Sequence, residues 1–217
     1  MTIVVLVRHG RTAANRRGIL AGQLPGMPLD GTGRRQAASL GTRLRRLPLD
    51  VVVHSPLERC AQTAQAIAAA RPSDPPTLVA DDRLVECDYG RWSGQSLAAL
   101  AQDPLWPRIQ SDPGSVRFPD GEAMSDMAAR AVAALADWAG RHPDGVVALV
   151  SHGDLIKAML SHSLAQPFAQ FQRIVVSPGS VSVVSVGADH TAVLGMNLRG
   201  GALPWAGAAP VVGGGAT

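Results

Sequence analysis

The feature that most constrains this chain is a run of buried-strand residues that ends in a cation and an imidazole. The segment IVVLVRHG, residues 3–10, begins with branched apolar side chains and finishes in Arg8, His9 and Gly10. A continuous, largely β-branched run of this kind is typical of a strand buried on both faces, as in a parallel sheet. The sequence therefore predicts a sheet with polar chemistry at the tip of a central strand.

A second segment, VALVSHGDLIKAML at residues 147–160, ends its apolar run in the same way, with His152 and Gly153 before a predicted helix. In open parallel sheets, ligands bind beyond the carboxyl ends of the strands, where the strand order reverses. We therefore expect His9 and His152 to face one crevice. The glycine after each histidine lets the backbone turn sharply and approach a ligand.

The remaining pattern predicts alternating strands and helices. Strands are expected over residues 3–7, 50–54, 77–80 and 146–150, helices over 33–46, 55–70, 124–141 and 154–164, and a closing pair over 180–186 and 192–196. This β-α-β order favours a parallel sheet with right-handed crossovers. Scattered Gly and Pro predict a loop over residues 13–28, and the Val/Ser alternation of residues 180–186 predicts one apolar face.

The length of 217 residues suits one domain. We expect it to span residues 1–199, with a cap insertion over residues 95–120 that is rich in proline and partly helical. Residues 200–217 are mostly Gly, Ala and Pro and predict a tail without stable structure.

Composition excludes several classes of protein. The formal charge of +3 comes without a Lys/Arg block or a basic strip interleaved with aromatics, which disfavours nucleic-acid binding. No apolar stretch is long enough for a membrane span, and the N-terminus lacks a signal-peptide pattern, so the cytoplasm is expected. Two cysteines cannot build a zinc cluster, and we expect neither a metal nor another cofactor.

The segment HSPLERC, residues 54–60, adds a second arginine to the same edge of the sheet. Arg59 is expected in the first turn of the helix that follows the strand. Together with Arg8 and the two histidines it forms a candidate site for a tetrahedral anion, because guanidinium groups bind phosphate bidentately. Alone, such a histidine is more often a structural hydrogen bonder and such an arginine a surface ion pair, but the combined pattern favours a phosphate site.

Chemistry at this site needs a nucleophile and an acid. The sequence has no Walker glycine loop, and a neutral histidine can attack phosphorus and become phosphohistidine. The segment RLVECDYGRWSG, residues 83–94, supplies Glu86. A partly desolvated carboxyl group there could keep its proton near neutral pH and protonate a leaving group. The alternative is that Glu86 is an ordinary surface carboxylate.

These segments resemble the histidine phosphatase superfamily, whose fold is also called phosphoglycerate-mutase-like. The resemblance covers residues 3–196 and includes LVRHGRTAAN, HSPLERCAQTA, RLVECDYGRWSG, FPDGEAMSDMAAR and VSHGDLIKAML, in that order. It implies a three-layer α/β/α sandwich with a mostly parallel sheet and one antiparallel strand near an edge. Arg11 together with QRIVVSPGSVSVV, residues 172–184, resembles a group of small actinobacterial members described as phosphomutases or phosphatases.

Carried over by position, the resemblance implies His9 as the phosphorylated nucleophile and Glu86 as the proton donor. It also implies a phosphate clamp made of Arg8, Arg59 and His152. Further substrate contacts are implied at Thr12, Asn15 and Gly22. One position departs from the family: Arg11 stands where relatives often have Glu.

The resulting expectation is a metal-independent phosphomonoester hydrolase acting on a small phosphorylated metabolite. The alternatives are a phosphoglycerate mutase, which must keep its phosphoenzyme from water, and a non-catalytic phospho-ligand binding module. The short, proline-broken insertion favours the phosphatase. A homodimer is possible. Cys60 and Cys87 each follow a predicted site residue, and they are either inert apolar side chains or thiols whose modification would displace Arg59 or Glu86.

Overall fold

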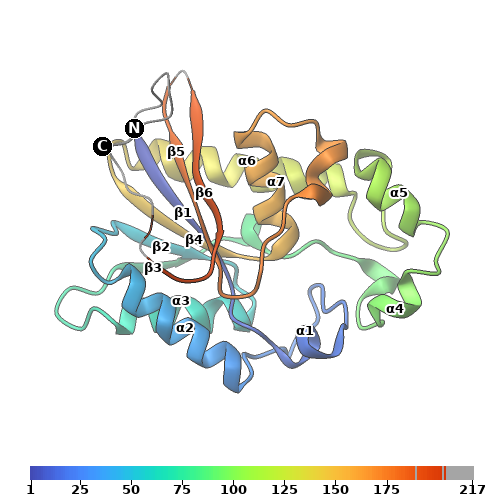
Figure 1. Ribbon diagram of the computed structural model, residues 1–217, viewed down its shortest axis with the longest axis horizontal. Coiled ribbons are helices and arrows are strands. Elements are labelled where there is room, and N and C mark those ends of the chain that lie inside the picture. The colour runs from blue at the N-terminus through green and yellow to red at the C-terminus, as the bar shows by residue number, and fades with distance from the viewer. Residues whose placement is uncertain (189, 202, 204–217) are drawn as a thin grey trace.

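The computed structural model describes residues 1–188, 190–201 and 203. Its centre is a six-stranded sheet in the order β3-β2-β4-β1-β5-β6 (Figure 1). The strands are Thr2–Arg8 (β1), Val51–His54 (β2), Thr77–Ala80 (β3), Val146–Ser151 (β4), Val181–Val186 (β5) and Thr191–Leu198 (β6).

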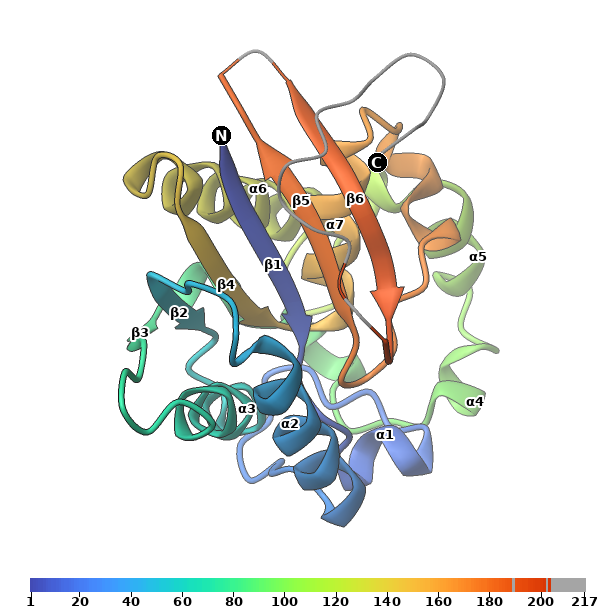
Figure 2. The ribbon, with the colours of Figure 1, turned by 60° about the vertical axis from the view of Figure 1, so that its left-hand side comes forward.

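Helices cover both faces of this sheet, which makes the predicted three-layer sandwich (Figures 1 and 2). The α-helices are Ala13–Arg17 (α1), Gly31–Leu44 (α2), Glu58–Ala69 (α3), Leu97–Leu100 (α4), Trp106–Ser111 (α5), Met124–Arg141 (α6) and Gly153–Ser163 (α7). Helices α2 and α3 lie on one face, and α6 and α7 lie on the other. Strand β1 is buried on both: Val5 belongs to the core under α2 and α3, and Leu6 to the core under α6 and α7.

The strand directions agree with the predicted sheet. Strands β3, β2, β4 and β1 are parallel, whereas β5 is antiparallel to both of its neighbours, β1 and β6. The one strand that runs against the others therefore lies next to the edge strand β6. The prediction of a mostly parallel sheet with one antiparallel strand near an edge is confirmed.

The order of the strands brings the two His-Gly tips together. Strand β4 is inserted between β1 and β2, so β1 and β4 are neighbours although they lie far apart in the sequence. Arg8 is paired with Ser151 in the parallel register, and the His9 amide donates to the Ser151 carbonyl at 3.1 Å. The residues that follow each strand are thus adjacent at one sheet edge.

Three local predictions were wrong. Residues 13–28 are not all loop, because Thr12 caps the short helix α1. Helix α3 begins at Glu58 rather than at Ser55, whose hydroxyl accepts from the Leu57 amide at 3.3 Å before the helix starts. Strand β5 is buried on both faces, its serines included, because β1 and β6 flank it and helices cover the sheet.

The cap segment, residues 95–120, contains α4, α5 and a 3-10 turn at Pro113–Ser115. Helices α4 and α5 lie at one end of the molecule, away from β2 and β3 (Figure 1). Of the predicted tail, residues 202 and 204–217 lie outside the described residues. No helix among the described residues is long and apolar enough to cross a membrane.

Candidate active site

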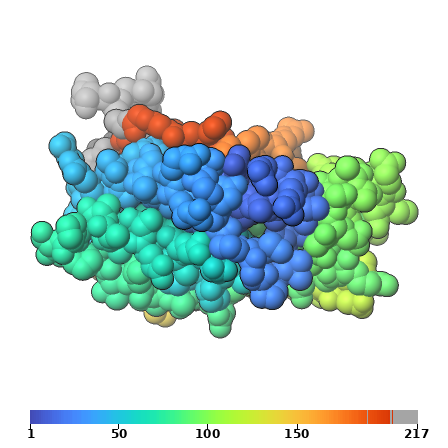
Figure 3. Space-filling model, turned by 90° about the horizontal axis from the view of Figure 1, so that it is seen from below, coloured from blue at the N-terminus to red at the C-terminus, as the bar shows by residue number. Residues whose placement is uncertain are grey.

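A pocket of about 440 Å³ opens beyond the carboxyl ends of β1 and β4. Its walls come from the β1 tip, α1, the cap segment and the first turns of α7. Figure 3 shows the face on which the blue of α1 borders the green of the cap. Of the residues predicted for the site, seven line this pocket: Arg8, His9, Thr12, Asn15, Gly22, Arg59 and Glu86.

His9 is a buried, neutral imidazole with one nitrogen available. The Nδ1 atom lies 2.7 Å from the Gly10 carbonyl oxygen, an acceptor, so Nδ1 carries the proton and Nε2 keeps its lone pair. Burial lowers the pKa of His9 well below its usual value, and the charges of Arg59 and Arg8 lower it further. A neutral imidazole with a free Nε2 is the form that can act as a nucleophile.

Two arginines stand beside His9, of which Arg59 is buried and Arg8 is half-buried. Arg59 lies in the first turn of α3, as predicted, and one of its guanidinium nitrogens donates to the Gly22 carbonyl at 2.8 Å. Arg8 donates through Nη1 to the Val176 carbonyl, while its buried Nε has no partner among the described residues. The two guanidiniums keep donors for an anion in the pocket.

Gly22 has a backbone reason to be glycine. Its φ of +52° is in the left-handed region, and a Cβ there would lie 2.7 Å from the Ser93 hydroxyl. The carbonyl of this tight turn is the acceptor that holds Arg59. Gly22 therefore contributes to the site by positioning the Arg59 guanidinium.

Thr12 and Asn15 hold each other in the capping box of α1. The Asn15 amide donates to Thr12 Oγ1 at 3.2 Å, and the Thr12 amide donates to Asn15 Oδ1 at 3.0 Å. The Asn15 carbonyl oxygen is used in this way, so its NH₂ group remains as a donor. This geometry suits the predicted role of both residues as substrate contacts.

His152 is the predicted residue that the structure does not place in the pocket wall. It is fully buried behind His9, with 5.2 Å between the ring centroids. Its Nε2 lies 2.8 Å from the Ser55 hydroxyl and 3.4 Å from the Cys60 sulfur. Gly153, the next residue, lines the wall instead. Burial lowers the pKa of His152 well below its usual value, with Arg59 adding to the effect.

Glu86 faces the same pocket and is only 9% exposed. One carboxyl oxygen accepts from the Cys87 amide at 3.0 Å. Burial raises the pKa of Glu86 to about 7; the charge of Asp154 also raises it, while Arg59 and Arg8 oppose the shift. A carboxyl group in this range can exchange a proton near neutral pH.

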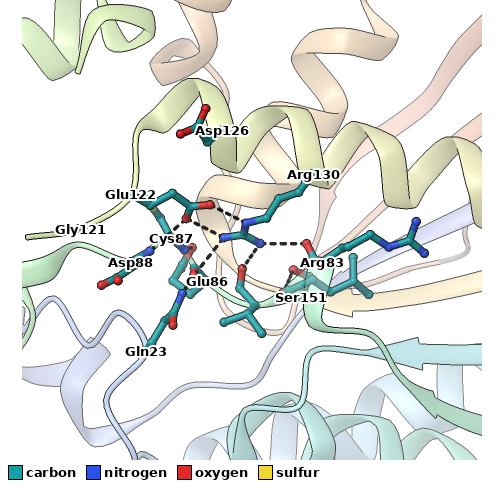
Figure 4. A network of polar contacts seen from close by, with 12 residues as sticks. Gln23, Arg83, Glu86, Cys87, Asp88, Gly121, Glu122, Asp126, Arg130 and Ser151 are labelled. Atoms are coloured by element: carbon teal, nitrogen blue, oxygen red, sulfur yellow. Dashed lines mark hydrogen bonds and ion pairs between the residues drawn. The ribbon is translucent and has the colours of Figure 1, made fainter. Parts of the chain in front are cut away.

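The backbone that carries Glu86 is held by an arginine that sequence reasoning missed. The Arg130 guanidinium donates to the carbonyls of Arg83 at 2.9 Å, Val85 at 2.6 Å and Glu86 at 3.2 Å (Figure 4). It also forms a two-point ion pair with Glu122, at 2.7 and 2.8 Å. The sequence motif could have indicated this role, because Glu122 and Arg130 both belong to the segment FPDGEAMSDMAAR.

Arg11, the departure from the family pattern, does not line the pocket. Its Nε donates to Asp30 at 2.9 Å, and its amide donates to the Gln36 side chain at 2.8 Å. These contacts connect the loop after β1 to the start of α2. Arg11 thus belongs to the scaffold of the site.

The two thiols are both fully buried. Burial raises the pKa of Cys60 to about 12, and it raises the pKa of Cys87 far above its usual value. Since the thiolate is the reactive form, this environment favours the interpretation of both as inert side chains. Among the described residues, no group of three or more His, Cys, Asp or Glu side chains is arranged to hold a metal ion.

Comparison with known families decides the identity. The model of the histidine phosphatase superfamily (branch 1) matches residues 4–199. The chain belongs to the histidine phosphatase superfamily. The resemblance read from the sequence motifs is therefore confirmed over nearly the whole chain, and the chain is an enzyme of the histidine phosphatase type.

Named relatives in this superfamily include phosphatases and mutase-like proteins. The chain is 30% identical to phosphoserine phosphatase 1 of Hydrogenobacter thermophilus, covering 91% of this chain and 93% of that one. It is 33% identical to a probable phosphoglycerate mutase of an Enterobacter species, over 84% of both chains. Its fold matches the mycobacterial glucosyl-3-phosphoglycerate phosphatase with a TM-score of 0.80 at 27% identity, covering 90% and 98% of the two chains.

Proposed function

We propose that this chain is a metal-independent phosphomonoester phosphatase that works through a phosphohistidine on His9. One observation carries the proposal: a neutral imidazole with a free Nε2 lines a pocket together with two guanidiniums and a carboxyl group whose pKa is about 7. These groups supply a nucleophile, anion binding and a proton donor in one place.

In the first step, Nε2 of His9 attacks phosphorus and the bond from phosphorus to the leaving oxygen breaks. Arg8 and Arg59 bind the non-bridging oxygens, whose charge they stabilise in the transition state. Protonated Glu86 gives its proton to the leaving oxygen, so an alcohol departs and a carboxylate remains. The phosphoryl group now resides on His9.

In the second step, water attacks the phosphohistidine. The Glu86 carboxylate takes a proton from this water while the bond from phosphorus to Nε2 breaks. Inorganic phosphate leaves, and His9 returns as a neutral imidazole. Glu86 therefore alternates between acid and base, which a pKa of about 7 permits.

The remaining predicted contacts fit around this cycle. Asn15 and Thr12 line the same pocket as His9. His152 packs against the His9 ring, with its Nε2 2.8 Å from the Ser55 hydroxyl. The ligand is a small phosphorylated metabolite; a homodimer and a cytoplasmic location stay predictions from the sequence.

The experiment is turnover of p-nitrophenyl phosphate in excess EDTA, with a rapid quench of enzyme mixed with phosphate-labelled substrate. We expect activity to survive chelation and a labelled protein that is stable to alkali and lost in acid. A binding module would bind vanadate or phosphate without turnover. Activity restored to chelated enzyme by one divalent ion would contradict the metal-independent mechanism.

The mutase alternative is separated by following two products from 3-phosphoglycerate, with 2,3-bisphosphoglycerate present to prime the enzyme. We expect release of inorganic phosphate to exceed isomerisation. Isomerisation that is faster than phosphate release by about an order of magnitude would identify a mutase, because the intermediate would then be kept from water.

A further inference from the structure

Outside the phosphate clamp, the pocket wall has its own composition. We call it the cap side and define it by its apolar residues Ile19, Leu97, Trp106 and Ile109 and by the charged pair Asp154 and Lys157. From this composition, and resting on the proposed phosphatase function, we infer that the enzyme takes phosphomonoesters whose leaving group is uncharged, largely apolar and larger than a three-carbon unit.

The charge of the leaving group follows from a count of cations. Among the described residues, Arg8, Arg59 and Lys157 are the Lys and Arg side chains that line the pocket. The two arginines face the phosphate, so only Lys157 is left for a second anionic group. Whether a carboxylate or second phosphate can bind depends on what Lys157 already contacts.

Lys157 already has an anionic partner and a second hydrogen-bond acceptor. Its ammonium group donates to Asp154 at 3.2 Å and to the Gln172 side chain at 2.9 Å, and it lies 5.2 Å from the centre of the Phe171 ring. Asp154 also accepts from the Tyr89 hydroxyl at 2.8 Å, which fixes the pair in place. A carboxylate entering the cap side would be desolvated next to a cation that is already neutralised, which is unfavourable.

The apolar character of the leaving group follows from the apolar residues of the cap side. Leu97 lines the pocket and is 40% exposed, so a bound ligand can remove its surface from water. Trp106 is held flat against Trp92, with ring centroids 6.3 Å apart and an angle of 22° between planes. The pocket volume of about 440 Å³ falls in the range of roughly 300–1,000 Å³ found for sites that enclose drug-sized ligands.

The test compares three esters of primary alcohols with similar leaving-group acidity: ethyl, 2-phenylethyl and 2-(4-carboxyphenyl)ethyl phosphate. We expect kcat/KM for the phenylethyl ester to exceed that of the ethyl ester by ~10–100-fold, the effect of burying one aromatic ring. The carboxylated ester should fall below the phenylethyl ester by about tenfold or more. Equal values for all three esters, or a preference for the carboxylate, would overturn the inference.

Two variants locate the effect. Leu97→Asn should reduce the preference for phenylethyl over ethyl phosphate several-fold, whereas the control Leu164→Asn, at a leucine of similar exposure outside this pocket, should keep it. Asp154→Asn frees the charge of Lys157, so the carboxylated ester should gain on the phenylethyl ester. No change in that ratio would show that the ion pair does not select the leaving group.

The failure of this inference is distinguishable from failure of the proposed function. If the enzyme forms an acid-labile phosphoenzyme and hydrolyses all three esters at equal kcat/KM, only the substrate class is wrong. If none of the esters nor p-nitrophenyl phosphate labels the protein, the phosphatase function itself is wrong.

Discussion

The two ends of the pocket are built in different ways. The phosphate end is formed by strand tips and helix starts, where the backbone of β1 and β4 fixes Arg8, His9 and Gly153. The cap side is formed by the short helices α4 and α5, by Ile19 and by the start of α7, and its side chains hold one another. The first arrangement suits a reaction common to every substrate, and the second suits the selection of one leaving group.

Loss of the nucleophile should have the largest effect and should be the same for every ester. We expect His9→Ala to lower kcat by more than about 10⁴-fold, the scale of removing a catalytic nucleophile, and to abolish the acid-labile phosphoenzyme. His162→Ala, at an exposed histidine of α7, is the matched control and should keep both. Labelling that persists in His9→Ala would place the phosphoryl group on another residue.

Glu86→Gln should have the second-largest effect on kcat, and the size of this effect should depend on the leaving group. We expect alkyl esters to slow by ~10²–10⁴-fold, the usual scale of general acid catalysis, and p-nitrophenyl phosphate much less, because its leaving group hardly needs a proton. An equal loss on both kinds of ester would mean that Glu86 only shapes the pocket.

The pH dependence follows from the same carboxyl group. Because the acid form donates the proton, kcat/KM for alkyl esters should fall as pH rises through about 7, the pKa of Glu86. Folding is linked in the same direction: the raised pKa contributes stability that is complete below the usual value of 4.5 and is lost as pH rises through about 7. Thermal melts of Glu86→Gln against the parent should show this part of the pH dependence removed.

Arg130→Met should have an intermediate effect through the backbone it holds. Loss of its hydrogen bonds to the carbonyls of Arg83, Val85 and Glu86 should displace the Glu86 carboxyl group and slow alkyl esters by ~10–100-fold, while p-nitrophenyl phosphate changes less. Rates are expressed per active site, counted by phosphoenzyme titration, so that partly unfolded protein does not lower the apparent rate. Arg117→Met, which breaks an exposed ion pair with Asp126, is the control and should change little. Equal loss on both esters would make Arg130 a purely structural residue.

The difference between the two ends also explains what the sequence could predict. Strands β1 and β4 are continuous apolar runs that end in His-Gly, and α6 has the predicted bounds because its apolar stripe repeats over the whole helix. Arg8 and His9 follow from the first of these strands. By contrast, the contact from Tyr89 to Asp154 joins residues 65 positions apart, and no local pattern marks such a pair.

Short capped elements were missed for a related reason. Helix α1 has five residues, too few for an apolar period, and depends on the reciprocal Thr12 and Asn15 side chains. His152 was expected in the pocket because its strand resembles β1. Its ring instead turns to Ser55 and Cys60, a choice that depends on packing across the sheet.

A substitution on the cap side should change binding and leave the phosphate end intact. Trp106→Leu should raise KM for 2-phenylethyl phosphate by about tenfold, since one stacking surface is lost. Hydrolysis of the phosphoenzyme should keep its rate, because the leaving group has already departed in that step. Single-turnover decay of the labelled protein measures this rate. Slower decay in Trp106→Leu would show that the cap also positions the attacking water, and the two ends would not be independent.

The smallest effect on kcat/KM is expected for substitution of Arg11. This substitution tests whether every cation near the tip of β1 belongs to the phosphate end. The Arg11 guanidinium pairs with Asp30, and its side chain is 35% exposed, so Arg11→Gln should lower stability by ~0.5–1 kcal/mol and leave kcat/KM unchanged within about twofold. Chemical denaturation and turnover of p-nitrophenyl phosphate measure the two quantities, and Arg11→Lys, which keeps the charge, should lie closer to the parent in stability. A tenfold loss of kcat/KM without a loss of stability would show that Arg11 reaches the substrate. The boundary of the phosphate end would then have to move outward to include a residue whose partners all belong to the scaffold.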